Sequence, residues 1–339
     1  CSQPIASVQA LKILVDKEGI YRISTERLSS AGMDIRSIGA DYLQLSLRGI
    51  EQSLHVISDE DGLWLEFYGQ ESDSLYSAEN IYILEAVNHK SEFTEFIDGG
   101  AREMPAPVEL EHSVYTERLH LEENLLYFPQ VEGSEHWFWA AAMSGQQQTF
   151  SFTLSETAPG EASIQFNLWS NTEASADPDH HLLLKMNDRL ILDQTWDGKG
   201  GQQFTATIPL GILVKGENSL LVDIPGDTGS EAEVIWINWY EISYPRYAVA
   251  EEEQLKFALD DQPFILDGFQ GFVHIYDVSD GNRAIFQTAV DAQEGSLAFS
   301  GIEGHIYYVV GEGGYHQPIS IAPLANIPDA RGMVEGADY

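Results

Sequence analysis

The stretch Glu233–Tyr244, EVIWINWYEISY, decides the fold class of this sequence. Its side chains alternate between two faces, with Trp236 and Tyr240 expected on one face and Trp239 on the other. Because successive side chains of a β-strand point to opposite faces, this pattern predicts a long strand with at least one face in the core. Pro245 follows directly and closes the segment.

The sequence around this stretch, from residue 124 to residue 246, is a series of short β-like segments. Glycine-rich turns separate them, and no long helical period interrupts them. Many short strands with regular turn signals predict a β-sandwich or jelly roll. The expected strands are His136–Ala142, Thr149–Leu154, Ser163–Ser170, His180–Asn187, Gln203–Ile208 and Asn218–Ile224.

The flanking regions also predict β-structure, so the expected fold class is mainly all-β. In the N-terminal region, Leu11–Val15 and Ile20–Ile23 are expected to form a hairpin, followed by a short helix capped by Ser24 or Thr25. The C-terminal region holds short strands that suit a small Ig-like sandwich. The expected parts are an N-terminal tether (1–10), a β-rich N-terminal domain (11–97), a linker (98–123), a jelly-roll-like β-sandwich (124–246), an Ig-like β-sandwich (247–322) and a loop-like tail (323–339).

The charge of the chain restricts its partners. Its 339 residues include 54 acidic and 17 basic side chains, for a formal charge of −37. Such a chain repels polyanions, so nucleic acid and anionic membrane surfaces are not expected partners. No stretch approaches the ~20 apolar residues that a membrane helix needs. The excess charge favours solubility outside the cell or in salt, and loading with divalent cations is the other interpretation.

The single cysteine is residue 1, and Ser2-Gln3-Pro4 follows it. This start is similar to that of mature bacterial lipoproteins, in which a lipid-modified cysteine precedes a short polar tether. We therefore expect Cys1 to be a lipid anchor and the chain's only contact with a membrane, because several acyl chains hold a protein firmly. A chain end that falls on a cysteine by chance is one alternative. An N-terminal nucleophile is another, although the small residues up to Gln9 suit a tether better.

The sequence carries no complete catalytic motif. A Cys/His site needs a thiolate beside an imidazole base, and Cys1 is the only thiol. A Gly-x-Ser-x-Gly elbow, a P-loop and a His-Glu-x-x-His helix are all missing. Acidic residues are abundant, which leaves hydrolysis by a carboxylate pair open without singling out any pair. We therefore expect the chain not to be an enzyme.

Three aspartates are candidate Ca²⁺ ligands. Asp177 and Asp179 lie in a loop before a predicted strand, and Asp227 lies in another loop. Calcium prefers oxygen ligands of this kind. His180 and His181 begin the strand and should point to opposite faces, which counts against zinc. A solvated loop is the alternative interpretation.

Trp196 is the tryptophan most expected to be exposed, because the turn Asp197-Gly198 follows it. An exposed indole ring can stack on a sugar, so Trp196 is a candidate glycan-binding residue. Packing in the core is the alternative for any single tryptophan.

An ordered set of segments carries a family resemblance. These are LKILVDKEGIYRI (Leu11–Ile23), LWLEFYG (from Leu63), NIYIL (Asn80–Leu84), HWFW (His136–Trp139), His180-His181 with Asn187, Trp196-Asp197-Gly198, Gly216-Glu217-Asn218, WYEISYPR (Trp239–Arg246), Phe269–Asp277 and IPDARGMVEGADY (Ile327–Tyr339). Their order resembles that of gingipain-type cysteine peptidase precursors, including the sortase group of type IX secretion. The resemblance covers nearly the whole chain, and it implies a cysteine endopeptidase whose catalytic His and Cys match nothing in these residues.

The resemblance implies that the chain is a non-catalytic accessory or prodomain region at the bacterial cell surface. It would assist the folding, masking or positioning of a peptidase domain that follows residues 323–339, or of a separate catalytic chain. The alternative is a stand-alone surface lipoprotein that binds glycan or assembles with copies of itself through strand edges.

Overall fold

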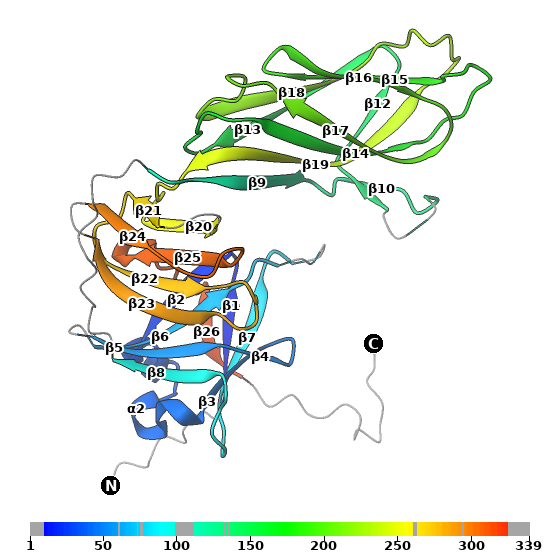
Figure 1. Cartoon of the computed structure of the whole chain (residues 1–339). Coiled ribbons are helices and arrows are strands. Elements are labelled where there is room, and N and C mark those ends of the chain that lie inside the picture. The colour runs from blue at the N-terminus through cyan, green and yellow to red at the C-terminus, as the bar shows by residue number, and fades with distance from the viewer. Residues whose placement is uncertain are drawn as a thin grey trace, which may run out of the picture. The chain divides into compact units, whose positions relative to one another are not determined.

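In the computed structural model, the described residues are 10–59, 62–72, 74, 77–98, 112–131, 133, 136–259, 263–292 and 295–324. They form a mainly β fold with two compact units (Figure 1), which confirms the predicted fold class. Unit 1 comprises Cys1–Val108, Glu252–Pro263 and Asp267–Tyr339, and unit 2 comprises Glu109–Glu251 and Phe264–Leu266. Cys1, the predicted tether up to residue 9 and the tail from residue 325 lie outside the described residues.

The N-terminal part of unit 1 consists of two sheets whose apolar faces share one core. The strand orders are β26-β1-β7-β3-β4 and β2-β6-β5-β8, and only the β5–β8 pair is parallel among the pairs described in these sheets. The strands are β1 (Ala10–Val15), β2 (Gly19–Ser24), β3 (Leu43–Leu47), β4 (Ile50–Gln52), β5 (Leu54–Asp59), β6 (Gly62–Gly69), β7 (Asn80–Ala86), β8 (Thr94–Asp98) and β26 (Ser320–Pro323). Short helices α1 (Thr25–Ser30), α2 (Ile35–Ile38) and η1 (Ala40–Tyr42) lie between β2 and β3.

Ser24 caps α1, as predicted, because its Oγ accepts a hydrogen bond from the Arg27 N–H at 3.2 Å. No helix among the described residues is long and apolar enough to span a membrane.

Strands β1 and β2 do not form the predicted hairpin. β1 pairs with β7 and β26, whereas β2 pairs with β6. Leu11 and Ile13 of one sheet meet Tyr21 and Ile23 of the other in a single buried cluster. The turn between the strands therefore carries the chain from one sheet to the other. A four-residue turn can join two paired strands of a hairpin or two strands of different sheets. Alternation along the strands could therefore not distinguish these two connections.

The second part of unit 1 is the small Ig-like sandwich. Its main sheet has the order β20-β25-β22-β23, and the turn Asp277–Gly281 leads from β22 toward β23. The elements are β20 (Gln254–Ala258), β21 (Phe264–Asp267), β22 (Gly271–Asp277), β23 (Ile285–Ala292), β24 (Ser296–Phe299), β25 (Ile306–Gly311) and η3 (Glu312–Gly314). Ile20 and Tyr68 from the N-terminal part share a buried cluster with Tyr276 and Tyr308. The two parts of unit 1 are therefore joined by a common core.

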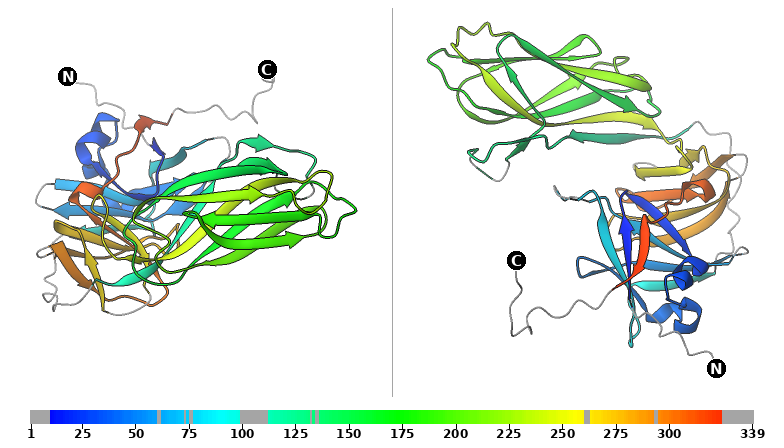
Figure 2. Two further views of the ribbon diagram at one scale, coloured as in Figure 1. Left: turned by 90° about the horizontal axis from the view of Figure 1, so that it is seen from above. Right: turned by 180° about the vertical axis from the view of Figure 1, so that it is seen from behind.

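The chain then returns to the N-terminal sheet. We call Glu312–Pro323 the return segment. Its last strand, β26, pairs antiparallel with β1, with Ser320 opposite Leu14 (Figure 2). The N–H of Leu324 donates to the carbonyl oxygen of Ala10 at 2.9 Å. The two ends of the described chain in unit 1 therefore lie side by side.

Side chains also hold the return segment. The Arg27 guanidinium donates to the side-chain oxygen of Gln317 at 2.8 Å and to the carbonyl of Pro318 at 2.7 Å. The side-chain amide of Gln317 donates in turn to the carbonyl of Arg22 at 2.9 Å. These contacts fix the segment against β2 and α1 before it reaches β1.

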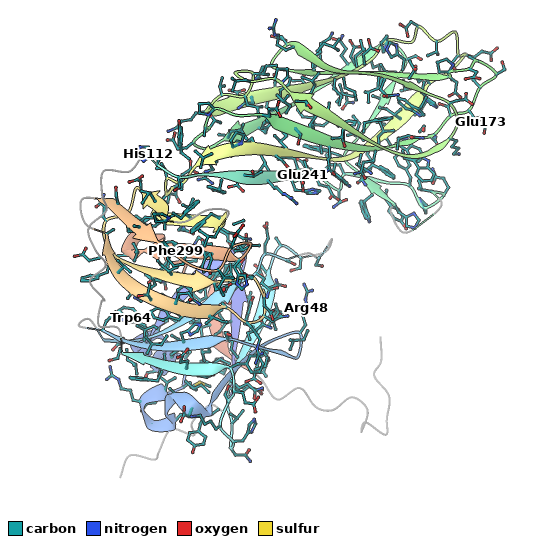
Figure 3. The ribbon with its side chains drawn as sticks, viewed as in Figure 1. Arg48, Trp64, His112, Glu173, Glu241 and Phe299 are labelled. Atoms are coloured by element: carbon teal, nitrogen blue, oxygen red, sulfur yellow. The ribbon has the colours of Figure 1, made fainter. Side chains whose placement is uncertain are left out.

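Unit 2 is the jelly-roll-like sandwich. One sheet has the order β12-β19-β14-β17, with β9 also paired to β19, and the other has the order β13-β18-β15-β16. The strands are β9 (Val114–Glu122), β10 (Leu126–Tyr127), β11 (Trp137–Phe138), β12 (Ala140–Met143), β13 (Gln146–Leu154), β14 (Ala162–Ser170), β15 (His180–Met186), β16 (Arg189–Trp196), β17 (Gly200–Ile208), β18 (Gly216–Ile224) and β19 (Val234–Tyr247). Figure 3 labels Glu241 on β19 of this unit and Trp64 on β6 of unit 1.

A β-bulge in β19 changes the predicted alternation. The register between β14 and β19 shifts so that Asn167 faces Trp239 while Leu168 faces Ile237. Tyr240 therefore lies in the main core, whereas Trp236 packs in a separate cluster on the other face. The prediction that Trp236 and Tyr240 share a face was wrong, because regular alternation holds only where no residue is inserted.

The predicted division into domains stays a prediction, but two strands do not fit its boundaries. Strand β9 falls in the stretch 98–123, predicted as a linker, and pairs with β19 along its whole length. Strand β26 spans residue 322, where the Ig-like sandwich was expected to end, and joins the N-terminal sheet.

Candidate functional site

The three predicted calcium ligands lie in unit 2 but do not form one group. Asp179 is 1% exposed, and its carboxylate accepts hydrogen bonds from two backbone N–H groups at 2.7 and 2.9 Å. Asp177 is exposed in the preceding loop, and Asp227 accepts a hydrogen bond from His181 Nδ1 at 2.7 Å. In the part of the chain that the structure describes, no three Asp, Glu, His or Cys side chains are arranged to hold a metal. A calcium site at the three aspartates stays a prediction.

His180 is fully buried at the start of β15. Its Nε2 donates to the carbonyl oxygen of Thr172 at 3.0 Å, and its Nδ1 faces the buried Glu233 carboxylate at 3.8 Å. Burial disfavours the charged imidazole, but Glu233, the Thr172 carbonyl and the charge of Asp179 outweigh it and raise the pKa of His180. The surroundings of His180 therefore favour its protonated form more than water does.

His181 points to the other face of β15 and lies between two exposed carboxylates. Its Nδ1 donates to Asp227 at 2.7 Å and its Nε2 donates to Asp193 at 3.0 Å. Partial burial lowers the pKa of His181, but the two hydrogen bonds outweigh it and raise that pKa. Neither imidazole is hydrogen-bonded to a hydroxyl group, so this end of unit 2 holds ion pairs without a nucleophile.

Trp196 is half-buried at the end of β16. One face of its ring stacks on His180, with centroids 4.9 Å apart and planes 8° apart. Its indole N–H donates to Ser170 Oγ at 3.1 Å, and the ring packs against the main core of unit 2. Glycan binding by Trp196 stays a prediction.

A buried ionic cluster inside unit 1 was missed in the sequence. Glu66 is fully buried, and its carboxylate accepts hydrogen bonds from Arg22 Nε at 2.6 Å, from His274 Nδ1 at 3.0 Å and from the Tyr276 hydroxyl. Burial raises the pKa of Glu66, but His274, Arg22 and Tyr276 outweigh it and lower that pKa to about 2. The sequence feature that could have indicated this cluster is the glutamate, Glu66, inside the apolar strand LWLEFYG.

The same cluster reaches the return segment through Arg22. The Arg22 guanidinium contacts Glu312 Oε2 at 2.9 Å, and its central carbon lies 3.8 Å from the centre of the Tyr315 ring. The cluster therefore ties β2, β6, β22 and the return segment together. Because its carboxylate is enclosed and accepts from three donors, the cluster has the character of a structural ion network.

One group in unit 1 combines a serine, a histidine and an aspartate. Asp277 accepts hydrogen bonds from His305 Nδ1 at 2.7 Å and from Ser279 Oγ at 2.6 Å. A catalytic triad needs the imidazole between the serine and the carboxylate, because the imidazole takes the serine proton. Here the carboxylate lies in the middle, so His305 does not activate Ser279.

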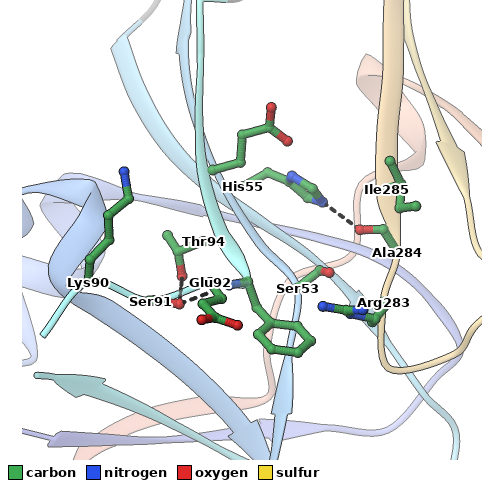
Figure 4. A pocket seen from close by; sticks show the side chains of 11 residues that line it. Ser53, His55, Lys90, Ser91, Glu92, Thr94, Arg283, Ala284 and Ile285 are labelled. Carbon is green, nitrogen blue, oxygen red and sulfur yellow. Dashed lines mark hydrogen bonds between the residues drawn. The ribbon is translucent and has the colours of Figure 1, made fainter.

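A pocket of about 690 Å³ lies within unit 1, between β5, the segment that enters β8 and the segment that enters β23 (Figure 4). Its lining residues are Ser53, His55, Lys90, Ser91, Glu92, Phe93, Thr94, Glu95, Arg283, Ala284 and Ile285. His55 is 3% exposed, and its Nε2 donates to the Ala284 carbonyl at 3.0 Å. Burial lowers the pKa of His55 to about 4, so the imidazole is neutral at pH 7.

Two exposed cations line this pocket: Lys90, whose Nζ contacts Asp41 Oδ2 at 3.2 Å, and Arg283. The guanidinium carbon of Arg283 lies 4.2 Å from the centre of the Phe93 ring. No motif predicted this pair, because the two residues come from distant parts of the chain and meet only through the tertiary fold.

No protein-family model and no curated protein matches the sequence. Among solved structures, the chain is similar to dimeric latent PorU from Porphyromonas gingivalis, with a TM-score of 0.65 and 15% identity over 94% of this chain and 33% of that one. It also matches the CBM36-1 domain of a multidomain xylanase from the hindgut metagenome of Trinervitermes trinervoides (TM-score 0.25, 11% identity, 37% of this chain and 96% of that one). A family 35 carbohydrate binding module from an environmental isolate matches with a TM-score of 0.26 and 15% identity, over 41% of this chain and 95% of the module. The chain thus has the fold of part of latent PorU and spans about a third of it.

Proposed function

We propose that this chain is the non-catalytic accessory region of a gingipain-type cysteine peptidase precursor at the bacterial cell surface. Its role is to assist the folding, masking or positioning of the peptidase. The observation that carries the proposal is the fold shared with latent PorU over nearly the whole chain. The ordered segments from Leu11–Ile23 to Ile327–Tyr339 resemble the same group of precursors.

The chemistry of the described residues supports a non-catalytic role. The Tyr276 hydroxyl beside the buried Glu66–His274 pair donates to Glu66, whose low pKa makes it a weak base, and in the Asp277 group the carboxylate separates the serine from the histidine. His180 and His181 contact carboxylates and a backbone carbonyl. None of these groups has the order of an activated nucleophile.

The return segment supports a positioning role. It ends in β26, which is hydrogen-bonded to β1, and Arg22 and Arg27 hold it at two earlier points. A peptidase domain joined through residues 325–339 would follow a strand that is fixed at the edge of the N-terminal sheet. Ala10, the first described residue, lies beside Leu324 at the same edge.

Two measurements test this proposal: the sequence of the reading frame after Tyr339 and the mass of the native protein. We expect a peptidase domain with a catalytic Cys and His to be encoded after Tyr339, and mass spectrometry of the native protein to show a lipid-modified Cys1. A frame that ends without such a domain would favour the stand-alone surface lipoprotein instead.

Activity of the isolated chain gives a second test. The purified chain should not hydrolyse casein or fluorogenic peptides, because its described residues form no activated nucleophile. Hydrolysis by the pure chain that iodoacetamide abolishes would contradict the accessory role.

A further inference from the structure

We propose that the pocket around Arg283 binds the carboxylate of a peptide that carries an apolar side chain next to it. The pocket lies wholly within unit 1, so binding needs no other part of a precursor. The inference goes beyond the accessory role and stands on the geometry of this pocket.

The guanidinium of Arg283 is free to take a ligand. It stacks on Phe93 and has no hydrogen-bond or ion-pair partner among the residues that the structure describes. In contrast, Arg246 and Lys215 are paired with carboxylates of the chain. A guanidinium presents its N–H donors in a planar fork that matches the two oxygens of a carboxylate.

The backbone on both sides of Arg283 is fixed to β5. The N–H of Ser53 donates to the carbonyl of Asn282 at 3.0 Å, and His55 Nε2 donates to the carbonyl of Ala284 at 3.0 Å. These bonds hold the position of Arg283 before any ligand arrives. Pre-positioned groups lose less entropy on binding, which is typical of a built site.

The Phe93 ring is fixed in the same way. The N–H of Phe93 donates to Ser91 Oγ at 3.2 Å, and its carbonyl accepts from the N–H of Leu54 at 3.0 Å. The aromatic ring and the guanidinium that stacks on it are therefore both carried by anchored backbone.

The rest of the lining narrows the ligand class. Phe93 and the 53% exposed Ile285 offer apolar surface. Glu92 and Glu95 are exposed at the pocket and balance the charges of Arg283 and Lys90. Because Lys90 is already paired with Asp41, a second negative charge on the ligand would be repelled. A single carboxylate beside an apolar side chain fits this lining, whereas polyanions do not. The volume of about 690 Å³ is sufficient for a short peptide.

Binding of matched short peptides to the full chain tests the proposal. The probes for a terminal carboxylate are acetyl-Gly-Leu and its C-terminal amide. The probes for a side-chain carboxylate are acetyl-Leu-Glu amide and acetyl-Leu-Gln amide. In ligand-detected NMR titrations, at least one acid should bind about tenfold more tightly than its uncharged partner. The pair that shows the preference identifies the source of the carboxylate.

Variants of Arg283 separate the site from general charge effects. Arg283→Gln should remove the preference for the acid, and Arg283→Lys should keep only part of it, because lysine retains the charge but not the planar fork. Arg189→Gln, at an exposed position on β16, is the matched control and should change nothing. Unchanged thermal unfolding midpoints should show that all three variants fold.

Several results would overturn the proposal. They are equal binding of acid and amide, a preference that survives Arg283→Gln, or no binding of any probe. Tighter binding of acetyl-Leu-phosphoserine amide than of the glutamate peptide would also overturn it, because Glu92 and Glu95 should disfavour a doubly charged group.

Discussion

Glu66→Gln is expected to destabilise unit 1, because the carboxylate of Glu66 is the buried anion that three donors share. Glutamine keeps the size of the side chain and removes its charge. The side chain of Arg22, only 8% exposed, then loses its buried counter-ion and keeps the exposed Glu312 at 2.9 Å and the partly exposed Asp59 at 4.0 Å. The change therefore isolates the charge of one buried group from its volume.

The magnitude follows from the pKa of Glu66. Folding lowers this pKa from 4.5 to about 2, a difference worth about 3 kcal/mol of folding free energy at neutral pH. Removing one partner of a buried ion pair costs about 3–5 kcal/mol in other proteins. Because Glu312 remains beside Arg22, we expect a loss near 3 kcal/mol.

The pH dependence gives a second readout of the same group. Because the pKa of Glu66 is lower in the folded state, its contribution is fully present above pH 4.5 and is lost as the pH falls towards about 2. The difference in stability between the natural chain and Glu66→Gln should therefore shrink as the pH falls below 4.5.

Urea-dependent hydrogen exchange with mass spectrometry measures both effects. Peptides from β6 and β22 report on unit 1, and peptides from β14 and β18 serve as an internal control in unit 2. Tryptophan fluorescence is less suitable, because Trp64 is the only one of the seven tryptophans in unit 1 (Figure 3).

Glu312→Gln is the matched control for Glu66→Gln. It removes a second carboxylate from Arg22, but the Glu312 side chain is 76% exposed, so the substitution should cost less than about 1 kcal/mol. Equal losses for the two variants, or a Glu66→Gln effect that does not change with pH, would refute the reasoning.

Two further variants test the return segment and the histidine pair. Gly19→Ala should destabilise unit 1 more than Gly62→Ala in urea, because a Cβ at Gly19 would lie 2.5 Å from the His316 ring, whereas Gly62, with a similar φ of +146°, has nothing within 4 Å. Equal losses of stability for the two variants would argue against close packing between Gly19 and His316. Unit 2 should lose stability as the pH rises above 6.5 through the raised pKa values of His180 and His181, since folding favours their charged forms. Changing both histidines to Gln should flatten the pH dependence of the stability of unit 2. An unchanged slope would mean that other groups cause this dependence.

Local patterns predicted the strands well where one face is buried. In β14, buried and half-buried residues alternate along Ala162–Ser170, and the predicted strand was Ser163–Ser170, so alternation located the strand to within one residue. Ser24 was predicted as a helix cap for a local reason, since its hydroxyl bonds to the third residue after it.

Strand pairing was not predictable in the same way. Leu11–Val15 and Ile20–Ile23 have the pattern of a hairpin, yet they belong to different sheets because both apolar faces enter one core. The pairing of Leu14 with Ser320 joins opposite ends of the chain, and neither segment carries a local signal for it. Alternation specifies which face is buried and leaves the partner strand open.

The candidate sites depended on the same long-range contacts. Glu66 and His274 are 208 residues apart in the sequence, and only the shared core of unit 1 brings them together. Arg283 and Phe93 likewise become a pair through anchored backbone. At Trp196 the sequence predicted an exposed ring, whereas stacking on His180 leaves the ring half-buried.

The pairing of β26 with β1 also determines how unit 1 responds to mechanical force. Ala10 and Leu324 lie at the same end of an antiparallel pair, so tension between the two ends of the chain pulls the strands apart at that end. In this geometry the hydrogen bonds break one after another, each under low load, instead of sharing the load in shear. Tension between a surface anchor and a following domain would therefore peel β26 away first. The hydrogen bonds from Arg27 to Pro318 and Gln317 would then be the next contacts to resist, and the ionic cluster at Arg22 would follow them.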